Sequence, residues 1–273
     1  INSLGLFRGL RGGSHNLATH GRWQRSTMSK GVVLVDWRDD VALLTLNRPE
    51  RRNAVDLDSL QLIRAAQVDA EKRKVRALVL TGAAPAFCAG ADLAGVREEV
   101  FHESLSEVLR GFTQLSCVTI AAIDGPALGA GAQLVVACDV RVATPTSVIG
   151  VPAAKLGLVV NHWTIERIVR ELSWPVARNM LLTASNYSAE ELARMGSIQR
   201  LGTLEDALSW ASDIAKLAPL TIRGHKVALE SSAGEPNIDA LVAACREEAL
   251  ASNDAREGRE AFMEKRQPKF LGS

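Results

Sequence analysis

The pattern of apolar and polar positions divides the chain into a first part rich in strands and a second part that is almost entirely helical. Short apolar runs bounded by turn residues predict strands at 32–37, 41–46, 77–81, 118–123 and 140–143, the first two forming a hairpin. Helical spacing predicts helices at 56–72, from after Asp92 to about 114, and at 129–138. Beyond residue 165 it predicts only helices, at 165–183, 188–195, 204–217, 219–231, 237–252 and 255–266.

Strand, glycine-rich turn and helix recur in the first part at a spacing of roughly 40 residues, which is typical of stacked units. The first helix can begin at a cap formed by Asp56 or Asp58. No GxGxxG motif follows the first strand, so a Rossmann sheet lacks its main signature. We therefore expect an α/β spiral core at 30–200 and a helical C-terminal region at 201–273.

Composition narrows the possible partners. The chain has 273 residues and is 47% hydrophobic, enough to fill a sizeable core. Its 32 basic and 31 acidic residues nearly cancel, which argues against nucleic acid as a partner. No apolar run reaches the ~18 residues that a membrane span needs. Four cysteines lie far apart without a CxxC pair, as in a reducing cytoplasm.

Residues 1–29 differ from the rest of the chain. They contain four arginines, several Gly and Ser, and no acidic residue. We expect this extension to be disordered and outside the fold. Arg-rich, acid-poor segments are also typical of organellar transit peptides. The alternative interpretation is an unrelated extension before a natural start at Met28.

Five segments resemble, in order and spacing, the motifs of the enoyl-CoA hydratase/isomerase (crotonase) family. They are NRPERRNA at 47–54, FCAGAD at 87–92, IDGPALGAG at 123–131, CDVR at 138–141 and EGREAFMEKR at 257–266. The resemblance covers about 32–270. It implies a crotonase-type spiral of ββα turns with a helical C-terminal trimerisation region. It also implies assembly as trimers or hexamers and an acyl-CoA ligand, with coenzyme A as part of the ligand and no separate cofactor or metal.

The resemblance implies that two backbone N–H groups meet the thioester carbonyl, and it places them at Ala89 and Ala130. Both residues lie in turns that open helices, where unpaired N–H groups and the helix dipole favour an oxyanion. Taken alone, either turn could be an ordinary tight connection. Their matching frame favours the binding interpretation.

Other ligand contacts are implied at matching positions. Arg51, Arg52 and Lys265 would lie near the CoA phosphates, with Lys265 supplied by a neighbouring subunit; each is otherwise a solvated surface charge. The remaining positions implied to line the CoA and acyl site are Ala54, Gly90, Ala91, Asp92, Trp163 and Phe262.

The acid–base residues of a classical hydratase are missing. The family uses two glutamates to activate water and to protonate the α-carbon, and the matching positions here hold Gln133 and Ala153. An amide does not exchange protons near neutral pH, and a methyl group cannot. Because each proton-transfer group contributes ~10²- to 10⁴-fold, we expect ordinary hydration to be lost.

Three other residues could carry chemistry. His162 could act as an acid or base, as histidine side chains often do, although a loop or cap histidine facing solvent is the commoner case. Asp92 could act as a base, or could cap the next helix. Cys88 could be a nucleophile, but no partner base is identifiable and a small buried thiol is commoner.

Segments 125–134, 155–158 with Asn161 and Trp163, and 264–270 are similar to a mycobacterial homologue within the family. That homologue is regarded as a non-catalytic fatty acyl-CoA carrier tied to mycolic acid synthesis. The similarity implies a carrier role here, with fatty-acid-synthesis enzymes as partners. Two alternatives stay open: a working hydratase, hydrolase or decarboxylase, and a scaffold whose pocket is vestigial.

Overall fold

The computed structural model describes residues 23–25, 31–92, 98–156, 158–231, 244, 247–249 and 251–273. The described strands form one seven-stranded sheet in the order β1-β2-β3-β4-β5-β7-β10, and a three-stranded sheet in the order β6-β8-β9. Their bounds are Gln24–Arg25 (β1), Val33–Arg38 (β2), Val41–Leu46 (β3), Ala77–Gly82 (β4), Val118–Ile123 (β5), Pro126–Leu128 (β6), Val140–Ala143 (β7), Val148–Gly150 (β8), Tyr187–Ser188 (β9) and Arg200–Leu201 (β10).

Helices connect the strands of the large sheet and then form the second half of the chain. Their bounds are Leu57–Lys72 (α1), Glu98–Gln114 (α2), Ala130–Ala137 (α3), His162–Leu172 (α4), Trp174–Thr183 (α5), Ala189–Arg194 (α6), Leu204–Ile214 (α7), Pro219–Ser231 (α8) and Asn253–Glu264 (α10). Two short 3₁₀ helices lie at Pro49–Arg51 (η1) and Pro152–Leu156 (η2). The predicted α/β spiral fold is confirmed.

The strand pairing follows from the connections. The predicted hairpin is present, because β2 and β3 pair antiparallel around a tight turn at Asp39, whose φ is 50°. The next pairs, β3–β4, β4–β5 and β5–β7, are parallel. Parallel neighbours require crossover connections, and α1, α2 and α3 lie within these crossovers.

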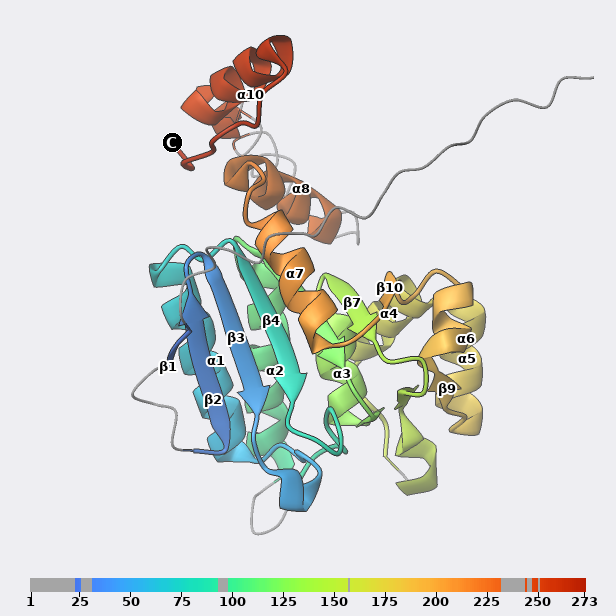
Figure 1. Ribbon diagram of the computed structural model, residues 1–273. Helices are drawn as coiled ribbons and strands as arrows, with labels where there is room; N and C mark the ends of the chain where they lie inside the picture. Colours follow the sequence, from blue (N-terminus) through green and yellow to red (C-terminus); the bar gives the residue numbers. More distant parts are fainter. Residues whose placement is uncertain are drawn as a thin grey trace, which may run out of the picture.

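Both faces of the central strands are buried, which explains their unbroken apolar sequences. Leu78 and Leu80 of β4 belong to the main core with α1 and α2. Ala77 and Val79 point to the other face and pack in a second cluster with α7. Figure 1 shows this layering, with α1 and α2 behind the sheet and α7 across its front.

Side-chain caps begin the helices where the sequence offers them. The carboxylate of Asp56 accepts a hydrogen bond from Ser59 N at 2.8 Å, so Asp56 rather than Asp58 caps α1. The segment predicted as one helix at 165–183 is two helices, α4 and α5. The break lies at Ser173, with a φ of 82°, followed by Pro175, which cannot donate a backbone hydrogen bond.

Part of the N-terminal extension belongs to the fold, contrary to the prediction for residues 1–29. Gln24 and Arg25 pair with the edge of β2, and the guanidinium of Arg38 lies 4.4 Å from the centre of the Trp23 ring. These contacts cover part of the outer edge of β2. Residues 1–22 and 26–30, and most of the helix predicted at 237–252, lie outside the described residues.

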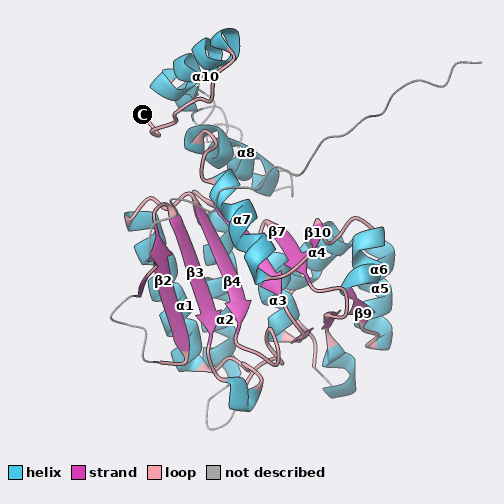
Figure 2. Cartoon of the chain, in the orientation of Figure 1, coloured by secondary structure: helices cyan, strands magenta, loops and turns pink. Residues whose placement is uncertain are grey.

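The C-terminal helices α8 and α10 project from one end of the large sheet (Figure 2). A buried ammonium group fastens α8 to the core. Lys226 Nζ donates to the carbonyls of Phe112 and Cys117 at 2.9 and 3.0 Å, and contacts Asp139 Oδ2 at 2.8 Å. Among the described helices, none combines the length and apolar character that a membrane span requires.

Replacing the buried Lys226 by methionine should lower the free energy of unfolding by about 3 kcal/mol, because a partly buried carboxylate loses its cation. Urea denaturation would measure the change. Lys216→Met is the matched control, since Lys216 is exposed and pairs with Asp213, three residues before it. Equal stability of the two variants would contradict the anchoring role of Lys226.

Candidate functional site

Two turns from different parts of the chain are joined by backbone hydrogen bonds. Val55 N donates to Gly90 O at 2.9 Å, and Asp92 N donates to Val55 O at 2.8 Å. This is the hydrogen-bond pattern of a short parallel bridge between Val55 and Ala91. The segment 87–92 is therefore held against the loop that precedes α1.

The same segment is held on its other side by the strand that leads into α3. Cys88 N donates to Pro126 O at 3.0 Å, and Leu128 N donates to Cys88 O at 2.9 Å. The approach is close, because a Cβ on Gly131 would lie 2.2 Å from Cys88 O. Gly129 adopts a φ of 56° immediately before α3. Glycine is needed at both positions: at Gly129 for the positive φ, and at Gly131 for the close contact with Cys88.

This pairing decides which N–H groups are available. Ala89 N donates to Arg52 O at 3.0 Å, so the prediction of Ala89 as an oxyanion donor is wrong for this structure. The carbonyl of Gly90 and the N–H of Asp92, on either side of Ala91, both bond to Val55. Because backbone groups alternate in direction along an extended segment, the N–H of Ala91 points away from residues 52–55. Within the described part of the chain, no hydrogen bond uses that N–H.

The second predicted donor is unaffected. Ala130 is the first residue of α3, where an N–H has no acceptor within its own helix. A Cβ placed on Gly129 would lie 3.8 Å from the Cα of Gly90, so the two turns are in direct contact. The available donors are therefore at Ala91 and Ala130, and this pair differs from the predicted pair in its first member.

Gln133 lies one helical turn after Ala130, on the same face of α3. Its side chain is buried, and its Oε1 accepts a hydrogen bond from Thr164 Oγ1 at 2.9 Å. Thr164 is in turn fixed at the start of α4, where Asn161 caps the helix. Ala153, in η2, packs against the main core. Neither position provides a proton-transfer group.

The alternative acid–base candidates are poorly placed for chemistry. The His162 side chain is 82% exposed and lies 3.7 Å from Glu166 on the outer face of α4. The prediction that it faces solvent is confirmed. Asp92 is held by Arg48, whose Nη2 lies 2.8 Å from Asp92 Oδ2. Residues 93–97 lie outside the described residues, so a cap by Asp92 on the next helix stays a prediction.

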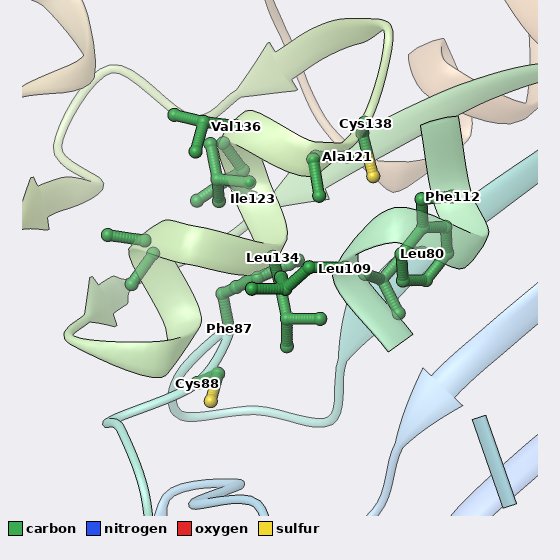
Figure 3. Packing of buried hydrophobic residues seen from close by; sticks show 14 of the residues in the cluster. Leu80, Phe87, Cys88, Leu109, Phe112, Ala121, Ile123, Leu134, Val136 and Cys138 are labelled. Atoms are coloured by element: carbon green, nitrogen blue, oxygen red, sulfur yellow. The ribbon is translucent and has the colours of Figure 1, made fainter. Parts of the chain in front are cut away.

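Cys88 is a buried thiol, as the commoner interpretation predicted. Its Sγ donates to Gly90 O at 3.5 Å, and burial raises the pKa of Cys88 to about 12. A thiol that stays protonated at neutral pH is a weak nucleophile. Figure 3 shows Cys88 in the hydrophobic core, together with Phe87 and Leu134.

The predicted ligand contacts are only partly brought together. Arg51 and Arg52 are exposed, and the backbone of Arg52 bonds to the 87–92 segment. Lys265 directly follows α10, and α10 lies beyond the end of the large sheet from which α8 projects (Figure 1). Trp163 packs partly buried against the main core. The side chain of Phe262 lies outside the described residues.

Asn53 and Arg48 also organise the site, and the sequence-based prediction did not include them. Asn53 is buried, and its Nδ2 donates to Ala83 O and Ala86 O, both at 2.6 Å. Its Oδ1 accepts from Arg48 N at 2.9 Å. Both residues stand in the NRPERRNA segment, whose polar positions were interpreted mainly as phosphate contacts. The available signal was a pair of polar residues in an otherwise tight turn.

The fold agrees with comparisons to known proteins. The model of the family described as enoyl-CoA hydratase/isomerase matches residues 36–273, and the chain belongs to this family. It is 38% identical to a probable enoyl-CoA hydratase, echA6, of Mycobacterium tuberculosis, over 89% of this chain and all of that protein. It is 33% identical to the 2,3-dehydroadipyl-CoA hydratase of Escherichia coli, over 88% of this chain and 98% of that protein.

A solved structure is similar over the same region. Enoyl-CoA hydratase EchA1 from Mycobacterium marinum superposes with a TM-score of 0.78 and 31% sequence identity. The match covers 89% of this chain and all of that one.

In the folded protein, iodoacetamide at about pH 8 should leave Cys88 unlabelled, because the raised pKa keeps the thiol protonated where a free cysteine is already partly ionised. Raising the pH towards 12 should speed the reaction, and urea should expose Cys88 to it at once. Peptide mapping by mass spectrometry measures labelling residue by residue. Rapid native labelling would instead revive Cys88 as a nucleophile.

Proposed function

We propose that this protein binds fatty acyl-CoA thioesters and holds them without appreciable hydration. The observation that carries the proposal is the pair of backbone donors at Ala91 and Ala130, which lie in contacting turns beside Gln133. A thioester carbonyl placed between two such N–H groups would accept two hydrogen bonds in a fixed geometry. The same carbonyl in water has hydrogen bonds of no fixed direction. Coenzyme A would arrive with the ligand.

The exposed apolar residues after η2 support an acyl chain as part of the ligand. Leu156, Leu158 and Val159 follow Ala153 closely and are exposed, Val159 by 90%. A bound alkyl chain would cover some of this surface and gain roughly 25 cal/mol per Å² buried. The basic side chains of Arg51 and Arg52 would lie on the side of the phosphates.

Loss of hydration follows from the same site. Adding water to a double bond requires one group to take a proton and another to return one. Gln133 is an amide whose oxygen is already bonded to Thr164, and Ala153 has only a methyl group. The exposed His162 and the ion-paired Asp92 offer no replacement, so a hydratase, hydrolase or decarboxylase using them is the less favoured alternative.

The proposal extends to assembly. Lys265 directly follows α10, and its expected contact with the CoA phosphates would come from a second subunit in a trimer or hexamer. A cytoplasmic role beside fatty-acid-synthesis enzymes, with the acyl group passed on rather than altered, fits such a carrier. The assembly and the carrier role are separate proposals, and a failure of either would leave the proposed binding site unaffected.

Purified protein incubated with a chain-length series of saturated and 2-enoyl-CoAs should bind them saturably and return them unchanged. Native mass spectrometry would record the bound ligand, and chromatography would record any product. Product well above the blank, removed by His162→Ala, would establish the enzyme alternative. Failure to bind any member of the series would contradict both the carrier and the enzyme hypotheses. The scaffold alternative would then remain.

Restoring both acids, Gln133→Glu with Ala153→Glu, should raise the rate of 2-enoyl-CoA hydration by at least about 10²-fold, because general acid–base groups would again lie beside the thioester site. The matched control is Ala153→Gln in the natural background, which adds similar bulk without a titratable group. Steady-state loss of the enoyl absorbance measures the rate. Equal rates for the two variants would show that these positions do not face the reacting carbons.

A further inference from the structure

The side chain of Arg48 joins the loop before α1 to the segment 87–92. We call the segment 87–92 the oxyanion turn, because it carries the N–H of Ala91. Its Nη1 donates to Ala54 O at 2.6 Å, and its Nη2 contacts Asp92 Oδ2 at 2.8 Å. Nη1 also lies 3.1 Å from Asp56 Oδ2. The Arg48 side chain is only 14% exposed. One guanidinium therefore contacts the backbone of the first segment and a side chain of the second.

The turn needs such a brace, because its own backbone is permissive. Gly90 has a φ of 132°, which L residues rarely adopt, and it has no side chain to lock that conformation. The direction of the Ala91 N–H is therefore set by what holds the residues around it. Val55 holds the backbone on both sides, and Arg48 holds the side chain of Asp92, the next residue.

A direct role for Arg48 in binding phosphate is disfavoured by its surroundings. The carboxylates of Asp56 and Asp92 both pair with it, so its charge is compensated within the protein. The neighbouring Arg51 and Arg52 are exposed and better placed for an anion. The geometry of the contacts uses the planar fork, in which two nitrogens serve separate acceptors, and a lysine cannot reproduce it.

We infer that Arg48 is the positioning residue of the oxyanion turn: through Asp92 it aims the N–H of Ala91 at the ligand carbonyl. This inference rests on the proposed function, because it assigns Arg48 to that same site. It differs from a purely structural role in one measurable way. A brace for the N–H affects ligands that carry a carbonyl and leaves others unchanged.

The test compares dodecanoyl-CoA with S-dodecyl-CoA, a thioether that has the same chain and CoA but no carbonyl. The natural protein should bind the thioester more tightly. Arg48→Lys and Asp92→Asn should each lower that preference by about three- to tenfold, the worth of one hydrogen bond, while thioether affinity stays the same. Isothermal titration gives both affinities, and Ala130→Pro, which removes the other donor, serves as the positive control.

Asp56→Asn is the matched negative control. Asparagine caps a helix as well as aspartate does, so this variant loses a carboxylate partner of Arg48 without touching Asp92. Its thioester preference should match that of the natural protein. A loss as large as that of Asp92→Asn would overturn the inference, since the guanidinium would then act on the fold in general.

The two failures can be told apart. If the natural protein shows no preference for the thioester, the proposed function fails and the role of Arg48 falls with it. If the preference is present but unchanged in Arg48→Lys and Asp92→Asn, only the inference about Arg48 fails. The infrared stretch of a ¹³C-labelled thioester carbonyl gives an independent readout, shifting down in the natural protein and less so in both variants. Should Arg48→Lys not fold, Asp92→Asn alone decides.

Discussion

The backbone pairing of the segment 88–92 is the constraint on which the rest of the site depends. Hydrogen bonds to the loop before α1 hold one side of the segment, and those to β6 hold the other. Once these bonds are made, only certain N–H groups are left over, and they sit where α3 begins. The position of the donors therefore follows from strand-like pairing, while the identity of the side chains beside them is left open.

Two largely buried positive charges, one in the site and one beneath α8, are balanced within the protein rather than offered to solvent. Arg48 sits between two carboxylates, and the buried Lys226 is surrounded by two carbonyls and Asp139. Buried ions of this kind stabilise poorly unless each is fully partnered. Their arrangement here ties loops and helices that come from distant parts of the chain, so they act chiefly on geometry. The exposed arginines of the η1 turn are the charges left to meet a ligand.

Much of the fold could be predicted from the sequence, because buried strands and amphipathic helices leave strong local patterns. The short strands β6, β8, β9 and β10 could not, since two or three residues carry no period. For the candidate site, the sequence could indicate two turns that the structure brings into contact, but not which of their N–H groups are already paired within the fold. Whether Ala89 or Ala91 offers its N–H depends on pairing with Arg52 and Val55, which are distant in sequence. The break at Ser173 has a local signal in Pro175, because proline is favoured in the first turn of a helix and disfavoured in its interior.

The close approach of Gly131 to Cys88 has a consequence for how this scaffold can change. At Gly131 any side chain would collide with the carbonyl of Cys88, so this position is fixed by the path of the main chain. Gln133 and Ala153 already carry side chains, so a change there alters chemistry rather than the approach of the two backbones. Under the proposed function, the path of the backbone holds the ligand, whereas the side chains at positions 133 and 153 decide whether the ligand reacts. The proposed binding and the proposed loss of hydration would then depend on different parts of the molecule, and one could change without the other.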